Sequence, residues 1–96
     1  MTRRYTQAML PQPGEIRKLR YGSDFRIPKG RGLFFVSSGE IVTILRSSLY
    51  RPAQSEHRAI STTVEILHEG RLLYWSGKAS LCFQLFQILS DEIPCP

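Results

Sequence analysis

The sequence predicts a mainly β protein built around a single core. In residues 64–75, two apolar runs flank Glu69-Gly70, which is the pattern of a β-hairpin. Residues 41–45 form a second apolar run that is rich in β-branched side chains and predicts a strand. The length of 96 residues suits one domain, and a hydrophobic content of 42% is ordinary for a globular protein. These features favour one small sheet folded around one hydrophobic core.

The N-terminal residues 1–13 predict a basic arm rather than a packed element. They contain Pro11 and Pro13 and lack apolar periodicity. Residues 14–89 are expected to form the domain, and residues 90–96 a C-terminal tail. The side chains that could anchor the arm to the domain are Tyr5, Met9 and Leu10.

Five segments precede the hairpin. Residues 14–20 follow a Pro-Gly turn and are a candidate first strand. Residues 21–32 contain three glycines and a proline, so they predict a long loop. The apolar run at residues 33–36 is too short for a helix and predicts a buried strand. Residues 41–45 predict the next strand, and the polar residues 47–59 predict an exposed loop.

The hairpin segment also predicts a register. Gly70 can take a positive φ without steric cost, so Glu69-Gly70 can form a two-residue turn. The β-branched residues 60–63 extend the first strand toward its N-terminal end. One face of the hairpin is then wholly apolar and is expected to point into the core. This predicted core face holds Val64 opposite Trp75 and Ile66 opposite Leu73.

Residues 77–93 allow two interpretations. A polar stripe recurs there at helical spacing, which favours one helix; its members are Ser80, Gln84, Gln87 and Asp91. A short helical turn over residues 78–84 followed by a strand over residues 85–89 fits the same segment.

The order of these signals resembles the small Src-homology-3-like barrel proteins that are common in tailed-phage genomes. The matching segments are Pro13 to Ile16, Gly39 to Leu45, Val64 to Leu67, Glu69 to Arg71, Trp75, Ser80-Leu81 and Phe86 to Leu89. The resemblance implies a small Src-homology-3-like β-barrel with a short helical turn near the C-terminus. It therefore favours the turn followed by a final strand in residues 77–93. The family shares no catalytic residues, so none are carried over.

Positive charge is concentrated in the first third of the chain. The net charge is +5, and residues 1–31 hold eight basic residues against Glu15 and Asp24. A basic surface favours an anionic partner, either nucleic acid or an acidic protein surface. The candidate partner-binding patch consists of Arg17, Lys18, Arg20, Arg26, Lys29 and Arg31.

The remaining reactive residues form no recognisable catalytic or metal-binding motif. Cys82 and Cys95 have no metal-ligand spacing and are too few for a disulfide framework. Cys82 lies among apolar residues and is expected to be a small buried hydrophobe. His57 falls in the polar loop, and His68 is expected to be an exposed residue beside the hairpin turn. We therefore expect no enzyme activity, no cofactor, no metal and no small-molecule substrate.

These features predict a non-enzymatic protein-interaction or structural module. The resemblance implies that it is phage-encoded, as a virion component or an adaptor. Its expected partner is another protein chain or a larger assembly. The alternative is a nucleic-acid-binding barrel, in which Tyr21 and Phe25 lie among the basic residues and could stack on bases. No apolar run approaches the roughly 20 residues of a membrane span, and no secretory signal is recognisable, so a cytoplasmic or virion-associated protein is expected.

Overall fold

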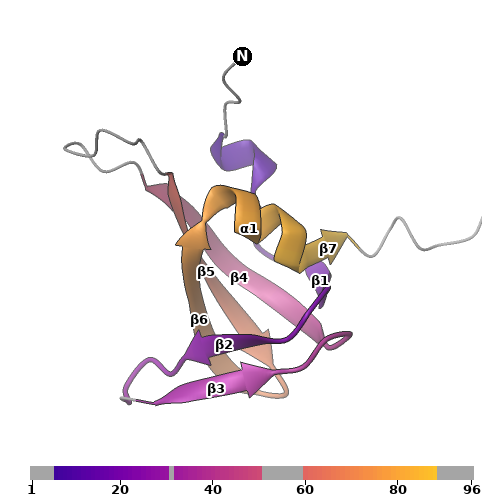
Figure 1. Ribbon diagram of the computed structural model, residues 1–96, viewed down its shortest axis with the longest axis vertical. Coiled ribbons are helices and arrows are strands. Elements are labelled where there is room, and N and C mark those ends of the chain that lie inside the picture. Colours follow the sequence, from indigo (N-terminus) through magenta and orange to yellow (C-terminus); the bar gives the residue numbers. More distant parts are fainter. Residues whose placement is uncertain (1–5, 31, 51–59, 89–96) are drawn as a thin grey trace, which may run out of the picture.

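The computed structural model of the chain describes residues 6–30, 32–50 and 60–88 (Figure 1). Its elements in chain order are the 3-10 helix η1 (Gln7–Met9), the strands β1 (Ile16–Leu19), β2 (Ser23–Arg26), β3 (Leu33–Val36), β4 (Ile41–Tyr50), β5 (Ser61–His68) and β6 (Arg71–Lys78), the helix α1 (Ala79–Leu85) and the strand β7 (Phe86–Ile88). The strands form one antiparallel sheet of seven, in the order β3-β2-β6-β5-β4-β1-β7, which is curled into a half-barrel. The predicted mainly β fold with one short helix near the C-terminus is thus confirmed.

The strands β5 and β6 form the predicted hairpin in the predicted register. Val64 lies opposite Trp75 and Ile66 opposite Leu73, and all four side chains are buried. Gly70 has a φ of +78°, as expected for the turn. The preceding residue is also left-handed, with a φ of +52°. Positive φ at both central residues is the hallmark of a type I′ turn, whose twist matches that of the two strands.

The core lies between the inner face of the sheet and the helix α1. Its buried hydrophobic residues are Leu10, Leu19, Phe25, Val36, Val42, Ile44, Val64, Ile66, Leu73, Trp75, Cys82, Leu85 and Phe86. The rings of Phe25 and Trp75 both meet Phe86 edge-on, with centroid distances of 6.4 Å and 5.8 Å. Such T-shaped pairs add to the stabilisation from burial. Phe86, near the end of the described chain, therefore packs against residues from β2 and β6.

The strand β2 corrects the prediction of a loop over residues 21–32. Phe25 is its one buried hydrophobic residue, so the alternation of apolar and polar side chains was too short to be recognised. The strand β3 forms as predicted, but the expectation that it is buried is wrong for most of its length. Val36 is buried, whereas Leu33 and Phe35 are 62% and 60% exposed. The reason is that β3 lies at the edge of the sheet and pairs with β2 alone.

The strand β4 is longer than predicted. It continues to Tyr50 and pairs with β5 from Thr43 to that end, so residues 47–50 correct the expectation of an exposed loop. A β-bulge between Ile44 and Arg46 shifts the register with β5. As a result, Leu45 and Arg46 are both exposed and Ser47 is buried. Residues 51–59, the remainder of the predicted loop, lie outside the described residues.

Part of the predicted N-terminal arm is packed against the sheet. The helix η1 lies beside β4, and Leu10 is fully buried in the core, as an anchor was expected to be. Met9, the second expected anchor, remains about half exposed. The expectation that the arm contains no packed element is therefore wrong for residues 7–10. Residues 1–5, including the third candidate anchor, lie outside the described residues.

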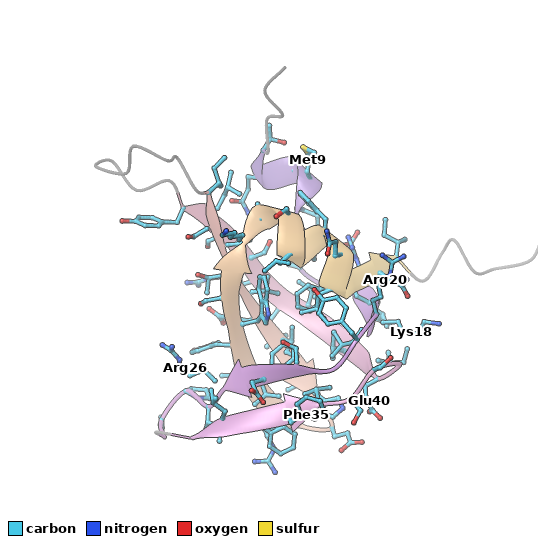
Figure 2. The ribbon with its side chains drawn as sticks, viewed as in Figure 1. Met9, Lys18, Arg20, Arg26, Phe35 and Glu40 are labelled. Atoms are coloured by element: carbon cyan, nitrogen blue, oxygen red, sulfur yellow. The ribbon has the colours of Figure 1, made fainter. Side chains whose placement is uncertain are left out.

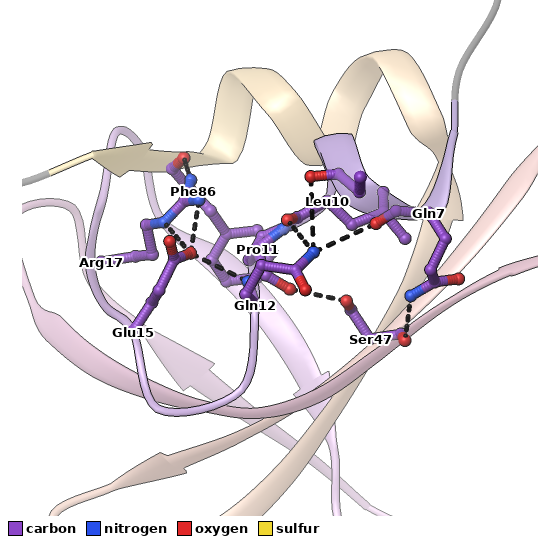
Figure 3. A network of polar contacts seen from close by, with 9 residues as sticks. Gln7, Leu10, Pro11, Gln12, Glu15, Arg17, Ser47 and Phe86 are labelled. Carbon is purple, nitrogen blue, oxygen red and sulfur yellow. Dashed lines mark hydrogen bonds and ion pairs between the residues drawn. The ribbon is translucent and has the colours of Figure 1, made fainter.

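Side-chain hydrogen bonds hold this N-terminal segment on β4 (Figure 3). The Gln7 amide donates to the Ser47 carbonyl at 2.7 Å and accepts from the Leu49 N–H at 3.2 Å. The Ser47 hydroxyl in turn donates to the Pro11 carbonyl at 2.6 Å. Because β1 pairs with residues 41–43 of β4, the Gln7 amide occupies a part of the β4 edge that β1 does not reach.

The helix α1 and the strand β7 confirm a short helical turn followed by a strand. The helix ends at Leu85, and β7 begins immediately and pairs with β1, where Phe86 lies opposite Leu19. The single-helix interpretation of residues 77–93 is therefore wrong for residues 86–88. Residues 89–96, including the predicted tail, lie outside the described residues.

Candidate functional site

The predicted basic residues do not gather into one patch. Figure 2 shows Lys18 and Arg20 on one side of the molecule and Arg26 on the other. Lys29 is exposed and follows Arg26 by three residues in the sequence, beyond the end of β2. Arg31 lies outside the described residues. The positive charge of this segment is thus divided between two ends of the fold.

The charge of Arg17 is compensated within the chain. Its guanidinium donates to one oxygen of Glu15 through Nη2 at 2.6 Å and Nε at 3.1 Å, and to the Phe86 carbonyl through Nη1 at 3.1 Å (Figure 3). The backbone N–H of Gln12 donates to the same Glu15 oxygen at 2.8 Å. This backbone bond, together with Arg17, holds the pKa of the Glu15 carboxyl below its ordinary value. Arg17 is buried and joins β1 to β7.

A groove of about 460 Å³ opens beside Arg17 and Arg20. It lies between η1, the end of β1 and the segment formed by α1 and β7. Its lining combines apolar side chains with amides and guanidinium groups, and none of the described residues that line it is acidic. They are Met9, Arg17, Arg20, Phe83, Gln84, Phe86, Gln87 and Ile88. Two of the predicted partner-binding residues therefore meet at one concave surface.

The opposite edge of the sheet, β3, is a second candidate surface. Ile27 donates its N–H to the Gly32 carbonyl at 3.5 Å, which marks a bonded pair between the two strands. Bonded pairs alternate along an antiparallel ladder, so the next one joins Phe25 and Phe34, which lie opposite each other. The backbone groups of Leu33 and Phe35 then point away from β2. Among the described strands, none pairs with that side of β3.

The two faces of β3 have different surroundings. On the inner side, the guanidinium of Arg71 lies 4.6 Å from the centre of the Phe34 ring, a cation–π contact. On the outer side, the ring of Phe35 lies over Gly22, where an added Cβ would come within 2.3 Å of the ring tip. Gly22 thus leaves room for Phe35 to lie against the backbone, although most of the ring stays exposed.

His68 is buried, which corrects the expectation of an exposed turn residue. Its Nε2 lies 2.9 Å from Oε1 of Glu40, and the ligand atoms of Glu40, His68 and Glu69 all lie within 4.8 Å of one another. Three such ligands can hold a divalent cation, but the hydrogen bond to Glu40 already accounts for the closest contact. The burial could have been recognised in the sequence, because His68 continues the alternation of Val64 and Ile66 on the core face.

Cys82 is buried, as predicted. Burial raises the pKa of the Cys82 thiol to about 12, even though Arg17 acts in the opposite direction. The neutral thiol that results near neutral pH is a poor nucleophile. His57 and Cys95 lie outside the described residues.

No family model matches the chain, and no curated protein and no solved structure is significantly similar to it. The relationship to Src-homology-3-like barrels of tailed phages therefore stays a prediction from the order of motifs. In the part of the chain that the structure describes, no helix is long and apolar enough to cross a membrane.

Proposed function

We propose that the chain is a non-enzymatic protein-interaction module, and that the free edge of β3 accepts an extended segment of a partner protein. The observation that carries the proposal is the direction of the backbone groups of Leu33 and Phe35, together with the exposure of their side chains. Their backbone groups point away from β2, and their side chains are 62% and 60% exposed. An added strand would bond to those backbone groups and cover both side chains.

The edge at β3 suits strand addition better than the edge at β7. At β7, the Phe86 carbonyl already accepts a hydrogen bond from Arg17, and the Phe86 N–H donates to the Cys82 carbonyl. The chain therefore uses part of that edge itself. No comparable contact occupies the outward groups of Leu33 and Phe35 within the described residues.

A nucleic-acid-binding barrel, the alternative, has weaker support. The exposed cations lie at two ends of the fold, with Arg26 far from Arg20 in Figure 2. Arg17 already has a carboxylate partner. Phe25, one of the two aromatic residues that could stack on bases, is fully buried in the core. Binding along a phosphate backbone needs several uncompensated cations on one surface.

The proposal includes a viral setting, in which the chain is a phage-encoded virion component or adaptor. This part is supported by the motif order from Pro13 to Leu89 alone.

Amide exchange tests the strand-addition proposal. Decapeptides are selected from a random display library against the wild-type protein, and the exchange of each β3 amide is measured with and without an enriched peptide. The Leu33 and Phe35 amides should become protected by about tenfold or more in the complex. The Phe34 amide, which already bonds to β2, should change little. Peptide binding that leaves both outward amides unprotected would contradict the proposal.

Matched variants control for non-specific binding to exposed apolar side chains. The double substitution Leu33→Thr, Phe35→Thr keeps residues suited to a strand but removes the apolar contacts, and should weaken edge binding by about tenfold. The comparison variant is Ile16→Thr, Ile41→Thr, which alters two side chains that are also about half exposed but lie on β1 and β4. It should leave binding unchanged.

A direct titration tests the alternative. Fluorescence anisotropy with duplex DNA at about 150 mM salt should show no micromolar binding. Tight binding that is lost when Arg26, Lys29 and Arg31 are all replaced by Ala would favour the nucleic-acid-binding hypothesis instead.

A further inference from the structure

We infer that the groove beside Arg20 is a second binding site, which takes a carboxylate side chain and a neighbouring apolar side chain from a partner protein. This site is separate from the proposed strand-binding edge, because β3 and β7 are the two opposite edges of the sheet. The inference does not depend on strand addition at β3.

The first argument is the charge of the lining. Arg17 is compensated by Glu15 at 2.6 Å and adds little attraction for a further anion. Arg20 is exposed, and no carboxylate of the described residues forms an ion pair with it. Since none of the described lining residues is acidic, Arg20 is the one guanidinium of this lining without a carboxylate partner among the described residues. A guanidinium binds a carboxylate through two parallel hydrogen bonds, which gives both affinity and orientation.

The second argument is the apolar part of the lining. Met9 from η1 and Ile88 from β7 are 48% and 47% exposed, and both line the groove. Methionine adapts its shape readily to an apolar side chain. Phe83 adds an aromatic surface from α1. These residues offer contact area beside the guanidinium, so the groove suits a segment that carries both an acid and an apolar group.

The third argument is the placement of the amides. Gln84 and Gln87 line the same groove and come from α1 and β7. Their side chains can bond to the backbone or the carboxylate of a bound segment. Because Phe86 already uses its backbone groups within the chain, recognition here proceeds through side chains rather than through strand addition.

An acidic peptide fits this lining better than a nucleic acid. A phosphate backbone presents charges at regular intervals and is bound by several cations in a row. Among the residues that the structure describes, the groove offers one uncompensated cation surrounded by apolar and amide groups. Arg26, an exposed cation, lies on the other side of the molecule (Figure 2).

A matched pair of charge substitutions tests the inference. Random decapeptides are selected on a display library against the wild-type protein, and each enriched peptide is titrated against Arg20→Gln and Arg26→Gln. Both substitutions remove one exposed positive charge. Peptides that contain Asp or Glu beside an apolar residue should bind Arg20→Gln about tenfold more weakly and Arg26→Gln within about twofold of wild type. Met9→Gln should also weaken them, while replacing the acid of the peptide by its amide should abolish the difference between the two arginine variants.

Several results would overturn the inference. One is the absence of any enriched peptide whose binding depends on Arg20. Another is an equal loss in both arginine variants, which would show that attraction to the net charge alone is responsible. Tighter binding of a 12-nucleotide oligothymidylate than of every acidic peptide would assign the groove to nucleic acid.

The chain's own C-terminal residues provide one more control. Asp91-Glu92-Ile93 places two acids beside an apolar residue shortly after β7. A variant that ends at residue 89 should bind acidic peptides with the affinity of the full chain. A clear gain in affinity would show that the groove is occupied by the chain itself, and would overturn the assignment to a partner.

The two proposed sites fail independently. If binding does not depend on Arg20 while the Leu33 and Phe35 amides become protected, the groove proposal is refuted and the strand-addition proposal is supported. If binding depends on Arg20 while the two amides stay unprotected, the strand-addition proposal is refuted and the groove proposal is supported.

Discussion

The indole ring of Trp75 lies directly over Gly77, so closely that a Cβ atom at Gly77 would come within 2.8 Å of two indole carbons. Residues two apart on a strand share a face, so the missing side chain of Gly77 makes the space into which the ring extends. The ring itself is buried and meets Phe86 edge-on at 90°. The position of the largest core side chain thus depends on a neighbour that has none.

Substituting Gly77→Ala should therefore destabilise the protein by about 1–3 kcal/mol, because the buried Trp75 ring has no room to move away. Urea unfolding followed by tryptophan fluorescence measures this directly. Gly22→Ala is the control. There the added Cβ comes even closer to a ring, that of Phe35, but this ring is exposed and can turn outward. An equal loss of stability in Gly77→Ala and Gly22→Ala would contradict the explanation that the burial of the Trp75 ring causes the loss.

The hairpin turn contains a residue that is poorly suited to its conformation. Glu69 has a φ of +52°, a region that asparagine adopts at lower cost than glutamate. Glu69→Asn should raise the free energy of unfolding by about 1 kcal/mol. Glu69→Gln removes the same negative charge near Glu40 without improving the backbone preference. Thermal or urea unfolding should therefore separate the two variants, and an equal gain in both would assign the effect to charge.

Thr62 presents a buried hydroxyl to the core. Its side chain is fully buried, and among the described residues its Oγ1 has no hydrogen-bond partner. Valine has nearly the same shape without the hydroxyl, so Thr62→Val should stabilise the protein by about 1–2 kcal/mol. Thr62→Ser keeps the hydroxyl and loses the methyl group, and should destabilise it. If Thr62→Val lowers the urea midpoint, the hydroxyl has a partner after all.

Glu15 should make stability depend on pH in the acidic range. Its folded-state pKa lies below the ordinary value of 4.5, chiefly because of the hydrogen bond from the Gln12 backbone and then because of Arg17. A group with a depressed folded pKa contributes stability above its unfolded pKa and loses that contribution as the pH falls through the folded pKa. The wild type should therefore exceed Glu15→Gln in urea midpoint at pH 7, and the difference should shrink below about pH 4.5. A difference that stays constant down to pH 2 would contradict this assignment.

Local patterns were sufficient to predict the centre of the fold. The hairpin register, the positive φ of Gly70 and the burial of Trp75 all follow from alternation around one turn, which involves residues close in sequence. The final strand was favoured over a longer helix by the order of motifs rather than by periodicity. The hairpin thus depends mainly on pairing between residues close in sequence, whereas the final strand pairs with the distant strand β1.

The features that the sequence did not predict depend on distant partners. The strand β2 has one buried residue, Phe25, and is recognised as a strand through its pairing with β3 and β6. The packing of η1 depends on Gln7, whose partners Ser47 and Leu49 are 40 and 42 residues away in sequence. No local period signals such contacts.

The candidate site was predicted in part. The sequence assigned Arg17, Lys18 and Arg20 to one strand but could not indicate that Glu15 compensates Arg17. It also could not place Met9 and Ile88 at the same groove as Arg20, because the pairing of β7 with β1 and the packing of η1 beside β4 bring these residues together.

The bulge in β4 determines how this chain can change in length. Up to Ile44 the odd-numbered residues of the strand face solvent, whereas beyond Arg46 the even-numbered ones do. Deleting Leu45 would leave Ile44 opposite Ile66 and Arg46 opposite Glu65 in a regular ladder. Ser47 and Leu49 would then keep their inward direction, and Gln7 would keep its two backbone partners. In the evolution of such a chain, substitutions at positions 45 and 46 and the loss of one residue at the bulge are compatible with the fold, since both side chains are exposed. A one-residue deletion elsewhere in β4 would instead turn the side chains beyond it to the other face.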